Sequence, residues 1–81
     1  MSISVYSKPG CVQCTATERH FGATPHEVID VTADENALAT VHALGYRAAP
    51  VVVIRDAAGT MLDHWSGFNP DAIDTWRQRA A

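Results

Sequence analysis

The chain has 81 residues, of which 47% are hydrophobic and 19% are charged. This length suits a single domain over residues 1–81, and the apolar fraction is enough for a packed core. The net charge is −3 with only six Lys and Arg residues, so nucleic acid is not an expected partner, because phosphate binding needs clustered basic side chains. No apolar run approaches the roughly 20 residues of a membrane span, and the N-terminus lacks the features of a signal peptide, so we expect a cytoplasmic protein.

The first part of the chain predicts a strand, a helix and a second strand. Residues 3–7, ISVYS, are rich in β-branched and aromatic side chains and predict the first strand. Residues 8–10, Lys-Pro-Gly, interrupt it, and a helix is expected from Cys11, or just after it, to about Phe21. Residues 26–31, HEVIDV, predict the second strand.

A second helix is predicted after this strand. Residues 32–35, Thr-Ala-Asp-Glu, have the Ser/Thr-x-x-Glu form of a capping box, which is typical of a helix start. Leu38, Val41 and Leu44 are spaced as an apolar stripe, and Gly45 stands where a helix usually ends.

The last part of the chain predicts a hairpin and a third helix. Residues 50–56, PVVVIRD, form the most hydrophobic segment and are expected to be a central strand. Residues 57–59 turn the chain into a strand over residues 60–65. Asn69 as N-cap and Pro70 at the first position predict a helix start, and the apolar face of this helix comes from Ile73 and Trp76.

These elements have the order β-α-β-α-β-β-α, which indicates an α/β fold. A right-handed crossover makes the first two strands parallel, whereas the closing hairpin is antiparallel. The sheet is therefore expected to be mixed, with helices packed on it. In such a small domain the junction after the first strand is the natural place for a functional site.

The only two cysteines, Cys11 and Cys14, lie at this junction. The free N–H groups and the dipole of a helix start are expected to lower the pKa of the Cys11 thiol and make it the exposed nucleophile. Cys14, one turn further, is expected to be more buried and to resolve the mixed disulfide. Val12 and Gln13 carry no charge and predict a reducing couple, near the thioredoxin end of a range of roughly −270 to −120 mV. Lys8 either adds favourable charge or is an ordinary exposed lysine.

Other uses of the two cysteines are less well supported. A staple that closes so short a loop would constrain the unfolded chain very little, and cytosolic thiols are kept reduced. C-x2-C is half of a zinc site, but the four histidines do not have zinc-finger spacing and no second C-x2-C follows. We expect no bound metal, and we retain a metal or iron–sulfur module and a redox-inert binding domain as lesser alternatives.

Three motifs together carry a family resemblance: CVQC (residues 11–14), ALGYRAAPVVV (43–53) and HWSGFNPD (64–71). With them the chain resembles the NrdH-type redoxins, glutaredoxin-like proteins of the thioredoxin fold, over nearly its whole length. The resemblance implies a four-stranded mixed sheet flanked by three helices, and a thiol-disulfide oxidoreductase with no bound cofactor. A monomer is expected.

The resemblance also implies the electron partners of the protein. Thioredoxin reductase would reduce the Cys11–Cys14 disulfide, so that NADPH is the indirect source of electrons. The dithiol would then reduce a class Ib ribonucleotide reductase and so support deoxyribonucleotide synthesis.

A partner-binding surface is implied as well. Pro50 matches the cis-proline of the fold, although a proline that starts a strand is ordinarily trans. Because proline has no N–H, the neighbouring backbone is expected to pair with an extended substrate segment. The WSGF run is associated with reductase docking in NrdH-type proteins; the alternative is that Trp65 is buried at a strand end and Phe68 belongs to the core. The candidate partner-binding residues are Lys8, Val12, Gln13, Ala49, Pro50, Trp65, Ser66, Gly67 and Phe68.

The main competing function is a glutathione-dependent glutaredoxin. Such proteins usually carry Gly-Gly followed by acidic residues where this chain has SGFNP (residues 66–70), and here Asp71 falls one position later. The chain also departs from the NrdH pattern in two places. Asn69 replaces the usual Arg or Gln, and the segment between Cys14 and residue 26 is about two residues short. Both departures bear on reductase affinity or loop length, and neither changes the expected reaction class.

Overall fold

The computed structural model of the protein describes residues 1–80, and its elements follow the predicted order. Each strand begins and ends within one residue of its expected bounds. None of the helices in the described part of the chain combines the length and apolar character that a membrane crossing needs. The elements are β1 (Ser2–Ser7), α1 (Val12–Phe21), β2 (Glu27–Asp30), α2 (Glu35–Ala43), β3 (Val51–Arg55), β4 (Met61–Ser66) and α3 (Pro70–Ala80).

The four strands form one mixed sheet, as expected, and their order in the sheet is β2-β1-β3-β4. β1 and β2 are parallel and pair Val5 with Val28, because the α1 crossover returns the chain in the same direction. β3 is antiparallel to β1 and to β4, and its turn into β4 is closed by the Asp56 N–H, which donates to the Thr60 carbonyl at 2.9 Å. The predicted hairpin is therefore confirmed.

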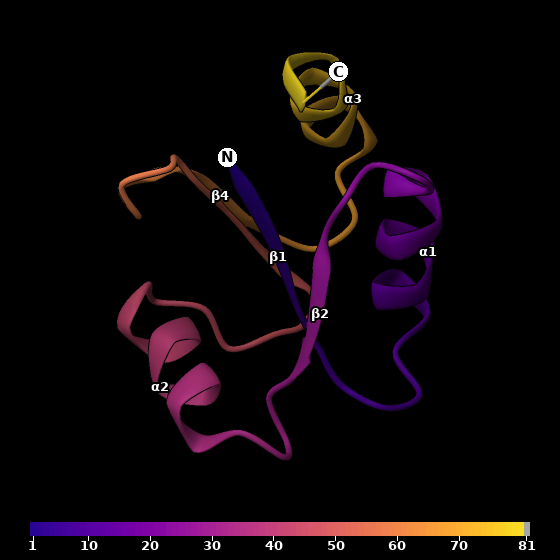
Figure 1. Cartoon of the computed structure of the whole chain (residues 1–81). Helices are drawn as coiled ribbons and strands as arrows, with labels where there is room; N and C mark the ends of the chain where they lie inside the picture. The colour runs from indigo at the N-terminus through magenta and orange to yellow at the C-terminus, as the bar shows by residue number, and fades with distance from the viewer. Residues whose placement is uncertain (81) are drawn as a thin grey trace.

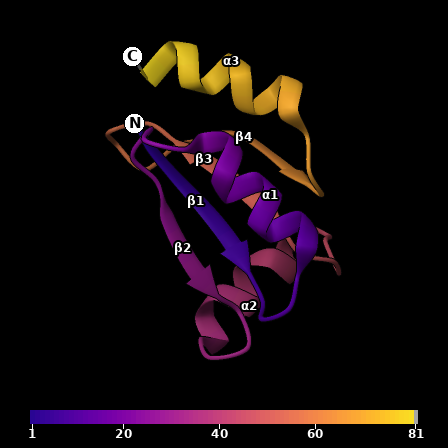
Figure 2. The ribbon, with the colours of Figure 1, turned by 90° about the vertical axis from the view of Figure 1, so that its right-hand side faces the viewer.

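Helices cover both faces of this sheet, α1 and α3 on one face and α2 on the other (Figures 1 and 2). Side chains alternate across a strand, so Val52 and Ile54 of β3 pack toward α1 and α3, and Val51 and Val53 pack toward α2. All four side chains are buried, which confirms β3 as a central strand. The core under α1 and α3 consists of Ile3, Val5, Phe21, Val52, Ile54, Trp65, Ile73 and Trp76.

The start of α3 is as predicted, whereas the predicted capping box of α2 is wrong. Asn69 Oδ1 accepts from the Ala72 N–H at 3.1 Å and so caps α3. In α2 the N-cap is Asp34, whose Oδ1 accepts from the Ala37 N–H at 3.0 Å. Thr32 instead donates its hydroxyl and backbone N–H to Asp30, and these two hydrogen bonds lower the pKa of the Asp30 carboxyl below its usual value. Thr32 is therefore hydrogen-bonded to Asp30 and does not cap α2.

The predicted apolar stripe of α2 is correct in part. Val41 is buried and Leu44 packs against the same core, but Leu38 is 38% exposed. Ala37 is the buried residue one turn before Val41, because residues four apart share a helix face. Gly45 follows the C-cap with φ of 89°, a left-handed conformation that favours glycine, so the predicted end of the helix is confirmed.

Candidate redox site

The two cysteines lie at the N-terminus of α1, as predicted. Cys11 is the N-cap and is partly exposed, whereas Cys14 lies in the first turn and is 1% exposed. Their sulfurs form a disulfide across a Cα–Cα distance of 5.2 Å. The expected division into an accessible and a buried sulfur is therefore present.

The surroundings of Cys11 favour negative charge on its sulfur. The Cys14 N–H donates to Cys11 Sγ at 3.2 Å, so one of the unpaired donors of the helix start is aimed at the sulfur. The positive end of the helix dipole adds to this effect, and the first turn of α1 contains no acidic side chain that would oppose it. Lys8 is exposed and lines the same surface depression as the cysteines. The N–H of Cys14 and the helix dipole favour a Cys11 thiolate when the disulfide is reduced.

The loop before β3, which is distant from the cysteines in the sequence, lies next to the disulfide. The Ala49–Pro50 peptide is cis, which is the conformation that the resemblance implied, and Pro50 is buried. The Ala49 carbonyl oxygen lies 3.8 Å from Cys11 Sγ, although the two residues are 38 positions apart. The chain therefore places this loop directly beside the reactive sulfur.

The loop between β4 and α3 is tied to both of these segments. Ser66 Oγ donates to the Ala48 carbonyl at 2.9 Å, and the Gly67 N–H donates to the Pro50 carbonyl at 2.9 Å. The Phe68 N–H donates to Gln13 Oε1 at 3.0 Å. Gly67 has φ of 87° there, and a Cβ at this position would approach Gln13 Oε1 to 3.3 Å, so glycine suits both the turn and the close contact.

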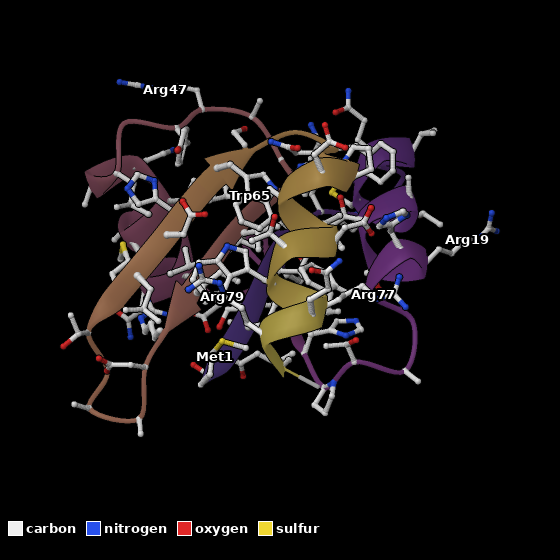
Figure 3. The ribbon with its side chains drawn as sticks, turned by 90° about the horizontal axis from the view of Figure 1, so that it is seen from above. Met1, Arg19, Arg47, Trp65, Arg77 and Arg79 are labelled. Atoms are coloured by element: carbon white, nitrogen blue, oxygen red, sulfur yellow. A yellow bond between two sulfur atoms is a disulfide. The ribbon has the colours of Figure 1, made fainter. Side chains whose placement is uncertain are left out.

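The two aromatic residues of this loop region lie in different environments. Trp65 is 8% exposed and belongs to the core that the sheet forms with α1 and α3, and Figure 3 shows it beside α3. Phe68 is 39% exposed, and Val12, between the cysteines, is 83% exposed. The structure therefore agrees with neither reading of the WSGF run in full, because Trp65 lies in the core and Phe68 lies at the surface. The exposed apolar groups close to the disulfide come from Phe68 and Val12.

One residue of this region could not be identified from the sequence. The ring of His20 lies against the ring of Phe68, with a centroid distance of 5.8 Å. It also contacts Asp74 of α3, which is 54 residues away in the chain. No local pattern indicates this contact, because it depends on how α3 packs beside α1.

The bond between Gln13 and Phe68 leads to a testable prediction. In a Gln13→Ala variant the acceptor is lost, so the Phe68 amide is expected to exchange with solvent about five-fold faster, as fits the loss of one hydrogen bond worth about 1 kcal/mol. Hydrogen exchange followed by NMR measures this rate. The Gly67 amide, which is bonded to Pro50, is the internal control and should keep its rate. An unchanged rate at Phe68 would show that Gln13 does not hold the loop.

Comparison with known proteins agrees with this geometry. The family model described as Glutaredoxin matches residues 3–57, a range that contains both cysteines and Pro50. The chain belongs to the glutaredoxin family. The glutaredoxin-like protein NrdH of Salmonella typhimurium is 38% identical over 76 residues, which cover 91% of this chain and 86% of that protein. NrdH of Escherichia coli is 37% identical with the same coverage. Within the family, then, the chain groups with the NrdH-type redoxins.

Solved structures support the same assignment. The NrdH-redoxin from Escherichia coli, a glutaredoxin-like protein with a thioredoxin-like activity profile, superposes with a TM-score of 0.79 at 36% identity and 93% coverage of both chains. The thioredoxin-like protein BC3987 superposes with a TM-score of 0.74 at 23% identity, which supports the fold alone. The predicted thioredoxin fold is confirmed.

The site defines the chemistry of the protein as thiol-disulfide exchange. An accessible sulfur with a stabilised negative charge can attack a disulfide, and a buried second sulfur within bonding reach can displace the product. The protein is a thiol-disulfide oxidoreductase whose redox group is the Cys11–Cys14 pair. Residues 1–80 contain no group of three or more His, Cys, Asp or Glu side chains that could hold a metal ion.

Proposed function

We propose that this redoxin is an electron carrier, acting as one domain in the cytoplasm, that thioredoxin reductase reduces and that in turn reduces a class Ib ribonucleotide reductase. NADPH would supply the electrons through the reductase. The 37–38% identity to NrdH proteins over most of the chain supports this proposal, as does the thioredoxin-like activity profile of the Escherichia coli NrdH-redoxin.

The choice of electron donor rests on the hydrogen bonds of the loop after β4. A glutathione site here would need free donors and a carboxylate for the amino end of the tripeptide. The N–H groups of Gly67 and Phe68 are already bonded to the Pro50 carbonyl and to Gln13. The first carboxylate that follows this loop in the sequence belongs to Asp71, which lies in the first turn of α3 and favours the helix start. A glutathione-dependent glutaredoxin is therefore the second candidate.

The proposed reaction passes two electrons in two exchange steps. The Cys11 thiolate attacks one sulfur of the target disulfide, so that a mixed disulfide forms and the other target sulfur leaves as a thiolate. The Cys14 thiolate then attacks Cys11 Sγ, which releases the second target sulfur and closes the Cys11–Cys14 disulfide. The target gains two electrons and two protons, and the redoxin loses them. The reductase dithiol reverses these steps on the redoxin.

We further propose that partners bind at a docking rim, by which we mean Val12, Ala49 and Phe68. Val12 and Phe68 offer exposed apolar surface, and aromatic side chains are frequent in protein-binding hot spots. The backbone beside Ala49 is suited to pair with an extended segment that carries the target cysteine. The other residues of this region support the docking rim through packing and through the hydrogen bonds described above; they are Gln13, Pro50, Trp65, Ser66 and Gly67. Lys8 adds positive charge near Cys11.

A coupled assay with two electron donors tests the proposed function. The oxidised protein is supplied with NADPH and thioredoxin reductase in one mixture, and with NADPH, glutathione and glutathione reductase in the other. NADPH oxidation in the presence of a disulfide substrate is measured in both. We expect turnover in the first mixture and little above background in the second. Activity in the glutathione mixture alone would reverse the order of the two candidates.

A second measurement addresses the acceptor. The oxidised class Ib ribonucleotide reductase is supplied with the redoxin, thioredoxin reductase and NADPH, and deoxyribonucleotide formation is followed. Product formation that depends on the redoxin is expected. Turnover of a generic disulfide without any support of the ribonucleotide reductase would leave the donor assignment standing and remove the acceptor assignment.

A further inference from the structure

His20 contacts both α3 and the loop between β4 and α3. It lies on α1, and its side chain is 32% exposed. Its Nε2 lies 2.7 Å from Asp74 Oδ1 on α3, so the N–H donates to the carboxylate. Its ring meets the ring of Phe68 edge-on, with an interplanar angle of 79° and a centroid distance of 5.8 Å. This is a favourable geometry for an aromatic pair.

Phe68 is therefore held at two points of the same helix. Its backbone N–H is bonded to Gln13, and its ring rests against His20. Gln13 and His20 are seven positions apart, a spacing that places them on one helix face. Asp74 fixes the His20 ring in turn, and Arg77 Nη1 lies 4.0 Å from the same carboxylate oxygen.

We infer that His20 is a positioning residue, which fixes the exposed Phe68 side chain on the docking rim through its anchor on Asp74. An exposed aromatic side chain without such a support would sample several rotamers, and a partner would have to select one of them. Ordering the ring beforehand removes this cost from binding. The functional part of this inference rests on the proposed function, because it assumes that a partner contacts Phe68.

His20 is too far from the sulfurs to act on them directly. His20 follows Cys11 by nine positions, which corresponds to roughly 13 Å of axial rise along the helix. A change at His20 should therefore alter the binding of a partner and leave the exchange chemistry as it is. This separates a positioning role from a catalytic one.

Steady-state kinetics with NADPH and thioredoxin reductase, with the redoxin as varied substrate, test the inference. His20→Ala is expected to raise KM for the redoxin about three- to ten-fold, as fits the loss of an aromatic pair, with kcat unchanged. Asp74→Ala should have the same effect, whereas Asp74→Asn keeps an acceptor oxygen and should restore a KM near that of the wild type. His42→Ala, an exposed histidine of α2, is the matched control and should leave KM unchanged.

A double variant shows whether His20 acts through Phe68. Once Phe68→Ala has removed the ring, His20→Ala should have no further effect on KM, because the two residues act through one contact. Equal effects of His20→Ala with and without the Phe68 ring would overturn the inference, and so would an unchanged KM in the His20→Ala variant.

An NMR measurement tests the same claim without any partner. Cross-relaxation between the His20 and Phe68 rings is expected in the free wild-type protein and should be lost in Asp74→Ala. Its absence from the wild type would overturn the inference whatever the kinetics show. If thioredoxin reductase does not turn over the wild type, the proposed donor is wrong, and the ring measurement alone decides whether His20 positions Phe68.

Discussion

Replacing Cys11 with serine is expected to reduce turnover of protein disulfides to the background rate with either electron donor. Cys11 is the accessible member of the pair, and its sulfur receives the N–H of Cys14 at the start of α1. A hydroxyl at this position can neither form nor exchange a disulfide. NADPH oxidation in the two coupled assays measures the effect. Substantial residual turnover would mean that Cys14 can attack external disulfides, against its 1% exposure.

The matched variant is Cys14→Ser, which keeps the attacking sulfur and removes the resolving one. We expect this variant to accumulate a mixed disulfide with its protein target, because no second sulfur displaces the product. Non-reducing electrophoresis and mass spectrometry would detect the adduct, which a reductant should release. In the reduced wild-type protein, limiting iodoacetamide at neutral pH should label Cys11 before Cys14. Labelling of Cys14 first would reverse the roles of the two cysteines.

Replacing Trp65 with alanine is expected to lower the free energy of unfolding by about 3–5 kcal/mol, the usual cost of removing a large aromatic side chain from a core. Trp65 packs with Ile73 and Trp76 of α3 against the sheet. The whole domain is expected to be stable by only about 5–15 kcal/mol, so this loss is large. Urea unfolding followed by circular dichroism measures the difference between the variant and the wild type.

Trp65→Phe is the control for this prediction. Trp65 Nε1 is buried and has no hydrogen-bond partner among the described residues, so phenylalanine removes an unpaired donor while it keeps an aromatic ring in the core. We expect a stability within about 1 kcal/mol of the wild type, because the smaller ring and the lost unpaired donor have opposite effects. If Trp65→Ala left stability unchanged and weakened only the reductase step, Trp65 would be a contact residue of the partner and not a core residue.

Much of the fold followed from local patterns. The β-branched run of β3 and the glycine turn before β4 predicted a central strand and a hairpin, because these signals lie within a few residues of one another. Asn69 and Pro70 predicted the start of α3 for the same reason. The capping box at Thr32 failed because two overlapping start signals compete there, and Asp30 binds the Thr32 side chain while Asp34 caps the helix.

The roles of the two cysteines also followed from the chain alone. A C-x-x-C at a helix start places one sulfur at the N-cap and the other one turn inside, so their difference in exposure is a property of helix geometry. The surface around them did not follow in this way. The sequence left Trp65 and Phe68 as equal candidates for exposure, and only the packing of α3 decided that Trp65 is covered and Phe68 is exposed.

The amino-acid sequence by itself determined the order of the elements, the mixed sheet and the redox pair, because the signals that indicate each of them lie close together in the chain. Beyond what the family resemblance implied, the tertiary structure alone decided which groups meet around the pair. Gln13 meets Phe68 across 55 residues, Cys11 meets Ala49 across 38, and His20 meets Asp74 across 54. Contacts over such separations exist only after α1, the loop before β3 and α3 have packed against the sheet, so no local pattern of residues encodes them.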